Sequence, residues 1–167
     1  MKKLDFAIYL LQVFDTLISK YNLEVKISRQ ISDIDESTII YNDKVGIEFV
    51  RNLREGILYV ALLKIENKKI PFWEGDRIIN LFIYLEVLGL ESEFPKVEKW
   101  DDSSQKYFIK EVFKMVIKHE HALFVSELRK FDFAVRERDK ELEKGISLSD
   151  EQSERIERIV KLTTKNK

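Results

Sequence analysis

The chain has 167 residues, 44% of them hydrophobic and 35% charged, a composition that predicts a globular protein with a core of its own. The 29 basic and 30 acidic side chains leave a net charge of -1, which argues against electrostatic capture of nucleic acid. Because the sequence has no cysteine, disulfide bonds, thiolate metal sites and a cysteine nucleophile are excluded. The apolar stretches are too short or too interrupted for a signal peptide or a membrane span, so we expect a cytoplasmic protein that does not bind membranes.

The N-terminal part of the chain predicts a helix followed by strands. Over residues 4–21, apolar side chains recur at helical spacing with charged residues between them, which is typical of a helix that packs on one side. Residues 23–27 alternate apolar and charged side chains and predict a short first strand. Residues 38–41 predict the next strand, after a polar connection.

Turn-forming residues separate the apolar runs that follow. Asn42 and Asp43 tolerate a positive φ, which predicts a tight hairpin into a strand that begins at Val45. A second turn over residues 51–56 ends at a glycine and leads into an apolar run over residues 57–65. Because that run is apolar on both faces, we expect it to be a central strand of a β-meander.

The second half of the sequence is predicted to be helical. Residues 78–88 are almost entirely apolar and predict a buried helix, which Gly89 ends. The segment 103–144 has no proline or glycine and predicts either one long helix or two helices broken near His119. A last short helix is expected over residues 156–162.

The sequence therefore predicts an α+β fold. We expect an antiparallel meander of three or four strands, packed by the N-terminal helix and the buried central helix, and followed by a C-terminal helical hairpin. Residues 1–100 form the α+β domain in this prediction, residues 101–162 form a helical region packed on it, and residues 163–167 are expected to be a disordered tail.

Few residues have the spacing that metal binding or catalysis requires. His119 and His121 are two positions apart, and on a helix such residues lie about 200° apart around the axis, so they cannot share a metal ion. The sequence has no glycine-rich phosphate loop and no Gly-x-Ser-x-Gly nucleophile motif. We therefore predict no catalytic residue, no metal site and no cofactor.

One enzyme class stays open as an alternative. A helix, a meander and a second helix resemble the opening of the restriction-endonuclease-like nuclease core, with Asp43 at a strand start and Glu66 and Lys68 after a later strand. The resemblance implies a magnesium ion held by the two carboxylates and a lysine that stabilises the attacking water or the phosphate charge. In that family the Glu-x-Lys motif normally lies within its strand, whereas here the apolar alternation has already stopped before Glu66.

A second resemblance covers about half of the chain. The N-terminal amphipathic helix, the stretch YNDKVGIEF over residues 41–49, and Arg54-Glu55-Gly56 leading into the next strand resemble the small α+β immunity-type proteins of low-GC bacteria. Those families accompany polymorphic toxins or are uncharacterised. The resemblance implies a cytosolic, non-catalytic protein that binds and blocks a partner protein.

Two places offer candidate surfaces for a protein partner. Arg51, Arg54 and Glu55 are expected on a hairpin tip, where their charges can pair with a partner. Phe72 and Trp73 follow Pro71 in the connection between a strand and a helix, and large aromatic side chains in loops are either lids over the core or interface anchors. Trp100, which closes another loop, has the same two interpretations.

A second copy of the chain is the alternative partner. The charged helix after residue 127 carries a narrow apolar stripe that includes Leu128, Phe131 and Val135. An exposed stripe of this kind normally packs either on its own domain or on a twin subunit, so these residues are a candidate homodimer interface. We thus expect a protein-binding module of the immunity or inhibitor type, or a homo-oligomeric structural protein, with no nucleic-acid partner.

Overall fold

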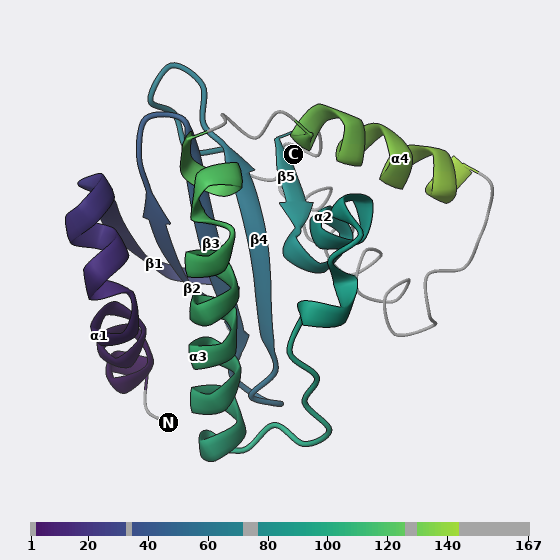
Figure 1. Cartoon of the computed structure of the whole chain (residues 1–167). Coiled ribbons are helices and arrows are strands. Elements are labelled where there is room, and N and C mark those ends of the chain that lie inside the picture. The colour runs from purple at the N-terminus through teal and green to yellow at the C-terminus, as the bar shows by residue number, and fades with distance from the viewer. Residues whose placement is uncertain (1–2, 33–34, 72–76, 126–129, 144–167) are drawn as a thin grey trace.

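The computed structural model describes residues 3–32, 35–71, 77–125 and 130–143, and in these residues five strands form one antiparallel sheet with helices packed across one face (Figure 1). The strands lie in chain order across the sheet: β1 (Glu24–Ser32), β2 (Asp35–Tyr41), β3 (Val45–Asn52), β4 (Leu58–Lys64) and β5 (Ile78–Asn80). The helices of the same residues are α1 (Lys3–Tyr21), α2 (Leu81–Leu88), α3 (Asp102–Lys118) and α4 (Phe131–Glu143), with a 3₁₀ turn over Glu91–Glu93 and a π-helical turn over His121–Val125. The fold is α+β, as the sequence predicts.

The predicted N-terminal helix, the meander and its first hairpin are confirmed. At the β2–β3 hairpin, the side-chain Oδ1 of Asn42 accepts hydrogen bonds from the backbone N–H groups of Lys44 and Val45, at 2.9 and 2.8 Å. The backbone N–H of Asn42 donates to the carbonyl of Val45 at 2.9 Å. An Asn side chain can replace a backbone acceptor in this way, which is why its position in the sequence marks the turn.

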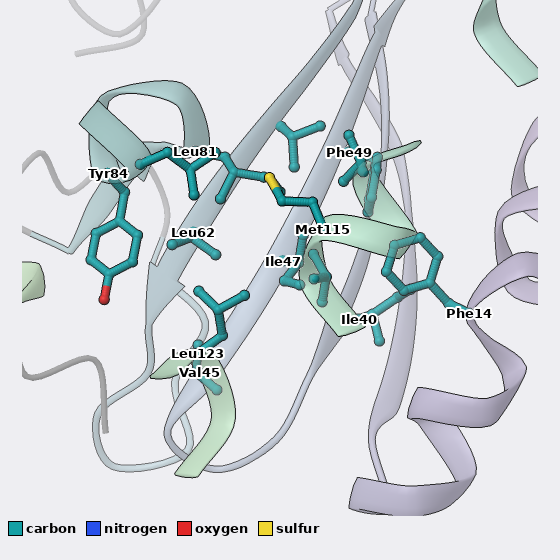
Figure 2. Close-up of a cluster of buried hydrophobic side chains, with 14 of the residues drawn as sticks. Phe14, Ile40, Val45, Ile47, Phe49, Leu62, Leu81, Tyr84, Met115 and Leu123 are labelled. Carbon is teal, nitrogen blue, oxygen red and sulfur yellow. The ribbon is translucent and has the colours of Figure 1, made fainter. Parts of the chain in front are cut away.

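The core lies between the sheet and the helices that cross it (Figure 2). Alternate residues of the inner strands point toward the helices, and Ile40, Ile47 and Phe49 on that face are each 0% exposed. Phe14 of α1 and Met115 of α3 reach into the same cluster. Full burial of side chains of this size contributes roughly 1.5–3 kcal/mol each, so this face of the sheet is the main source of stability.

The strand count is higher than expected, because the described sheet has five strands rather than three or four. The predicted helix over residues 78–88 is wrong in its first turn: Ile78–Asn80 form β5, and Ile79 lies opposite Leu62 of β4. Asn80 then caps α2, its Oδ1 accepting from the N–H of Phe82 at 2.8 Å. A short apolar run fits a buried strand as well as a buried helix, so periodicity could not separate the two.

The predicted end of α2 at Gly89 is confirmed. Gly89 has φ 70° and ψ 30°, in the left-handed region that glycine adopts without strain. Its N–H donates to the carbonyl of Glu86 at 2.9 Å, and the N–H of Leu90 donates to the carbonyl of Leu85 at 2.8 Å. These two bonds satisfy carbonyl groups that the last helical turn would otherwise leave without donors.

In the described residues of the segment 103–144, two separate α-helices, α3 and α4, replace the single long helix. α3 ends at a C-cap formed by His119, whose φ of -111° is no longer helical, and the π-helical turn follows at once. The break is thus where the two-helix alternative places it. Phe108, Val112 and Val116 of α3 lie in the same apolar cluster as the sheet.

The expectation that Phe131 and Val135 form an exposed seam for a second copy is wrong. Phe131 is 0% exposed and Val135 is 6% exposed, and both belong to the main core cluster. The ring of Phe131 lies 6.5 Å from the ring of Tyr84, which α2 contributes. A narrow apolar stripe has the same sequence pattern whether its own domain or another subunit covers it, and here its own domain covers these two residues. Leu128 lies outside the described residues.

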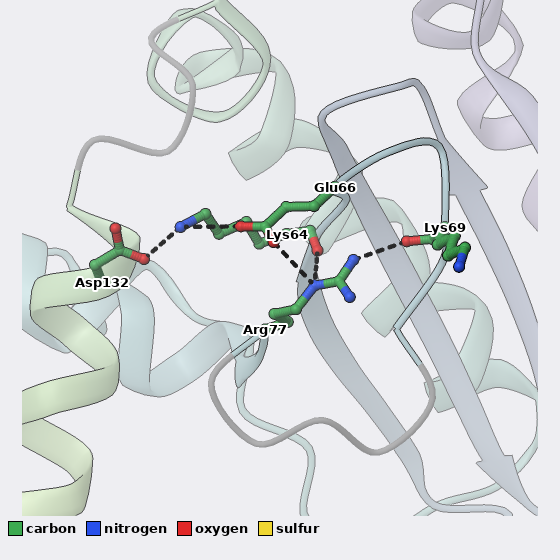
Figure 3. Close-up of polar contacts among 5 residues, drawn as sticks. All are labelled: Lys64, Glu66, Lys69, Arg77 and Asp132. Atoms are coloured by element: carbon green, nitrogen blue, oxygen red, sulfur yellow. Dashed lines mark hydrogen bonds and ion pairs between the residues drawn. The ribbon is translucent and has the colours of Figure 1, made fainter.

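Polar contacts fasten α4 and β5 to the end of β4 (Figure 3). The Nζ of Lys64 lies 2.7 Å from Oδ1 of Asp132 and 3.6 Å from Oε1 of Glu66. The guanidinium of Arg77 donates to the backbone carbonyls of Lys64 and Lys69, at 3.3 and 2.9 Å. The hydrogen bond to Asp132 is the main cause of the raised pKa of Lys64. Exposed ion pairs contribute only about 0–1 kcal/mol each, so these contacts orient α4 more than they stabilise it.

The expected helix over residues 156–162 and the tail over residues 163–167 lie outside the described residues. In the part of the chain that the structure does describe, no helix is long and apolar enough to cross a membrane.

Two phenylalanines of α4 test its packing. We expect Phe131→Ala to lower the free energy of unfolding by about 3–5 kcal/mol, because it removes a fully buried ring and leaves a cavity beside Tyr84. Phe133 is 53% exposed on the same helix, so Phe133→Ala should change the free energy by no more than about 0.5 kcal/mol. Urea unfolding followed by circular dichroism measures both. Equal losses in the two variants would contradict this placement of α4.

Candidate functional site

The turn between β3 and β4 carries two of the predicted partner-binding residues. Arg54 and Glu55 are both exposed there. The Oδ1 of Asn52 accepts hydrogen bonds from their backbone N–H groups, at 3.0 and 2.9 Å. Gly56 closes the turn with φ +70°, and its N–H donates to the carbonyl of Asn52 at 2.8 Å. Three hydrogen bonds to one asparagine thus hold the exposed charges on a rigid backbone.

Arg51, the third residue expected at this tip, lies beneath it instead. Its side chain is buried in β3 and forms an ion pair with Glu36, the residue directly opposite it on β2. Its guanidinium also lies 4.9 Å from the ring centroid of Phe6 on α1. Arg51 is only 3% exposed, so it has almost no surface to offer a partner. Because removing one member of a buried ion pair leaves a charge without compensation, we interpret Arg51 and Glu36 as the support of the turn.

A hollow of about 320 Å³ opens beside this turn. Residues 51–56 line one side of it, and Trp100 and Gln105 line the other. Trp100 is half-buried, and its ring packs edge-on against Phe108 at 5.1 Å between centroids. The two interpretations of Trp100 thus combine, since the ring packs on the core and also forms a wall of the hollow.

Gln105 is the most unusual residue of the hollow. It lies in the first turn of α3 and is 4% exposed, and its Oε1 is buried without a hydrogen-bond partner among the described residues. A buried amide oxygen without a donor costs about 1–3 kcal/mol. The residue lines the hollow, although the oxygen itself is buried.

The start of α3 holds both Trp100 and Gln105 in place. Asp101 is the N-cap residue, and its Oδ1 accepts from the N–H of Ser104 at 2.9 Å and from the hydroxyl of Ser103 at 2.6 Å. These bonds favour the ionised carboxylate and lower the pKa of Asp101 to about 2. The cap fixes the first helical turn, in which Gln105 faces the β3–β4 turn.

Sequence reasoning found the turn but missed two of its neighbours. Leu53 is 40% exposed at the same turn, and an apolar residue between two turn-forming asparagine and glycine positions was the available signal. Gln105 had no signal, because only the fold brings it beside Gly56. Phe72 and Trp73, the other predicted partner-binding residues, lie outside the described residues.

The residues of the nuclease alternative lie at the opposite end of β3 and β4. Asp43 is exposed at the β2–β3 hairpin, and Glu66 is ion-paired with Lys64 and with Arg77, at 3.6 and 3.9 Å. Lys68 is exposed in a tight turn and has φ 59°. Within the described ranges there is no group of three or more His, Asp or Glu side chains that could hold a metal ion. Metal-dependent cleavage stays a prediction that only a nuclease assay tests.

The two histidines have different surroundings. His119 is partly buried, and its Nε2 lies 2.9 Å from Oε2 of Glu93. The Nζ of Lys118 lies 2.8 Å from the other oxygen of that carboxylate. Hydrogen bonds from Lys118 and then His119 lower the pKa of Glu93. This cluster ties the end of α3 to the 3₁₀ turn, whereas His121 is exposed.

Comparison of the chain with models of protein families, with curated proteins and with solved structures found no match. The resemblance to immunity-type proteins therefore stays a prediction. Function has to be inferred from the geometry of the β3–β4 turn and its hollow.

Gly56 and Gly89 have the same φ of +70°, so comparing alanine substitutions at the two positions distinguishes the cost of backbone strain from the cost of close contacts at the hollow. A Cβ at Gly56 would lie 2.6 Å from Nε2 of Gln105 and 3.1 Å from the carbonyl oxygen of Trp100, whereas a Cβ at Gly89 would meet nothing within 4 Å. We expect Gly89→Ala to cost about 1 kcal/mol through strain alone. Gly56→Ala should cost at least about 1 kcal/mol more, because Gln105 and the Trp100 carbonyl must shift.

Chemical denaturation measures both variants. Combining Gly56→Ala with Gln105→Ala should recover part of the additional loss, since the nearer clash disappears. If Gly56→Ala were no more costly than Gly89→Ala, the close packing of the β3–β4 turn on α3 would be wrong.

Proposed function

We propose that this protein is a non-catalytic protein-binding module, and that its partner docks on the turn surface, defined as Leu53, Arg54, Glu55 and the adjoining hollow. The observation that carries the proposal is the combination of an exposed apolar side chain with two opposite charges on a hydrogen-bonded turn, next to a polar hollow. Interfaces commonly combine an apolar anchor with polar neighbours of this kind.

Rigidity supports this function. Binding loses free energy when a loop must be ordered, and a turn that is already fixed by Asn52 and Gly56 avoids most of that loss. The buried pair of Arg51 and Glu36 supports the turn from below. The turn surface can therefore present its charges in one geometry, which favours selection of one partner over others.

The hollow supports a partner that inserts a hydrogen-bond donor. Oε1 of Gln105 is buried at its wall and accepts from none of the described residues. In this proposal the side chain of Gln105 turns toward the hollow when the partner binds, and its oxygen accepts from an N–H group of the partner while an acidic or basic neighbour pairs with Arg54 or Glu55. Pairing a buried acceptor that was without a donor contributes more than adding a contact on exposed surface.

The partner class follows from the resemblance to immunity-type proteins. In this proposal the chain binds a toxin-like protein and blocks it by occupying its surface, with no chemistry of its own. The net charge of -1 gives no long-range attraction to a strongly charged partner, so complementarity at the turn surface has to provide the selectivity.

Co-expression tests the proposal. The tagged chain is produced together with the product of the neighbouring gene, and co-purification is measured for the natural sequence and for Leu53→Asp combined with Arg54→Glu. We expect the complex to form with the natural sequence and to be weakened at least roughly tenfold by the double substitution, because it removes the apolar anchor and reverses a charge. Titration calorimetry gives the ratio.

Phe133→Ser is the matched control, because Phe133 is also a large exposed apolar residue but lies on α4, far along the chain from the turn. It should leave the affinity unchanged. A complex that survives the turn substitutions, or one that Phe133→Ser disrupts equally, would place the binding surface elsewhere.

A further inference from the structure

The two edges of the sheet are protected to different extents. At the β5 edge, α4 begins near one end of the strand (Figure 1). There Nη1 of Arg138 donates to the backbone carbonyl of Ile78 at 2.9 Å. At the other edge, β1 pairs with β2 alone among the described residues. An uncovered edge strand presents unpaired N–H and C=O groups to which another strand can bond.

The register identifies which groups of β1 face outward. The backbone N–H of Asn42 donates to the carbonyl of Val45 at the start of β3. Backbone groups of successive residues point to opposite sides of a strand, so the N–H and C=O groups of Tyr41 point toward β1. Tyr41 lies opposite Glu24, so the backbone N–H and C=O groups of Glu24 point toward β2. Because alternate residues face opposite ways, Val25 and Ile27 direct their N–H and C=O groups away from the sheet. The side chain of Ile27 is also 50% exposed, although it lies on the strand face that elsewhere is buried.

We propose that β1 pairs with β1 of a second copy of this chain, antiparallel and centred on Val25, so that two sheets join at this edge. In this register Val25 meets itself, and Ile27 lies opposite Leu23 of the second copy. The N–H of Leu23 already donates to the carbonyl of Ile18 at 2.9 Å, so at this pair the hydrogen bond runs from the N–H of Ile27 to the carbonyl of Leu23. Glu24 lies opposite Lys26 of the second copy, and the two-fold axis repeats this pair. Glu24 and Lys26 are both exposed on the other face of the strand, where a second copy can approach them.

Charge selects this register over its neighbours. A two-fold pairing centred on Lys26 would place two lysines directly opposite each other, and one centred on Glu24 would do the same with two glutamates. Like charges directly opposite each other destabilise strand pairing, whereas opposite charges stabilise it. Of these three registers, only the one with its two-fold axis at Val25 pairs residues whose backbone groups point outward. It also gives two attractive pairs of side chains. The edge is therefore self-complementary in the way that a two-fold interface requires.

This surface is separate from the turn surface and from the earlier candidate interface on α4. It uses residues 23–27, so the dimer leaves the β3–β4 turn available to a partner. A pairing of a few residues per strand buries less area than permanent dimers do, and we expect a dimer that forms with rising concentration.

Charge reversal on the full-length chain tests the register. Glu24→Lys gives the edge two positive charges, and Lys26→Glu gives it two negative charges. We expect each variant alone to dimerise roughly tenfold more weakly than the natural chain, because both symmetry-related pairs become repulsive. An equimolar mixture of the two variants should form a heterodimer about as strongly as the natural chain forms its homodimer. Sedimentation equilibrium over a concentration series measures all of these.

Tyr41→Phe is the control for folding effects. The hydroxyl of Tyr41 donates to Oε2 of Glu24 at 2.9 Å, and Tyr41→Phe removes this bond without changing the charges of the edge, so dimerisation should be unchanged. Val25→Pro removes an outward N–H while leaving the bonds to β2 intact, and it should abolish the dimer. A chain that stays monomeric at the highest concentration, a dimer that the single reversals do not weaken, or a mixture that does not recover would overturn the proposal.

Discussion

Packing of α1 and α3 on one sheet face is the constraint from which the rest of the structure follows, and Phe14 is where the three elements meet. Its ring lies 5.2 Å from the ring of Phe49 on β3 and 5.2 Å from the ring of Phe113 on α3, edge-on in both cases. Because side chains alternate along a strand, burying Phe49 also places Arg51 on the buried face. The register then sets Glu36 opposite Arg51, and the buried charge is paired.

The face of the sheet opposite the helices is apolar in one part and charged in another. Near β4 it carries a small apolar cluster that includes Ile39, Leu63 and Ile65. On β3, directly opposite Ile39, the carboxyl of Glu48 has its pKa raised by burial, an effect that Ser37 and Lys26 oppose. Of the β1 side chains that the structure describes on this face, Glu24 and Lys26 are charged and exposed. An edge of that composition does not collapse onto any apolar surface, so pairing at it depends on charge complementarity.

Local turn chemistry made the first half of the fold predictable from the sequence, whereas contacts between distant segments did not. Asn42 and Gly89 act through hydrogen bonds to residues within a few positions, and both were found. The structures of Ile78 and Phe131 depend on what packs over them. Ile78 lies in a strand although its sequence pattern fits a helix equally well. Phe131 lies in the core although its pattern fits an exposed stripe equally well. The surroundings of Gln105 could not be predicted, because Gly56 is far from it in the sequence. Nothing near Gln105 indicates that Gly56 will lie against its amide.

The same reasoning explains why both proposed surfaces involve backbone as much as side chains. The helices cover one face of the sheet, and α4 covers the β5 edge, where Arg138 occupies an outward carbonyl. Among the described residues, the β1 edge of the sheet and the turn at the end of β3 both stay accessible. Recognition by backbone and by a few charges needs little apolar area, so it is compatible with the near-neutral charge and the fully used core of this chain. In such a protein, specificity comes from register and turn geometry, because these are the features that the buried face of the sheet holds constant.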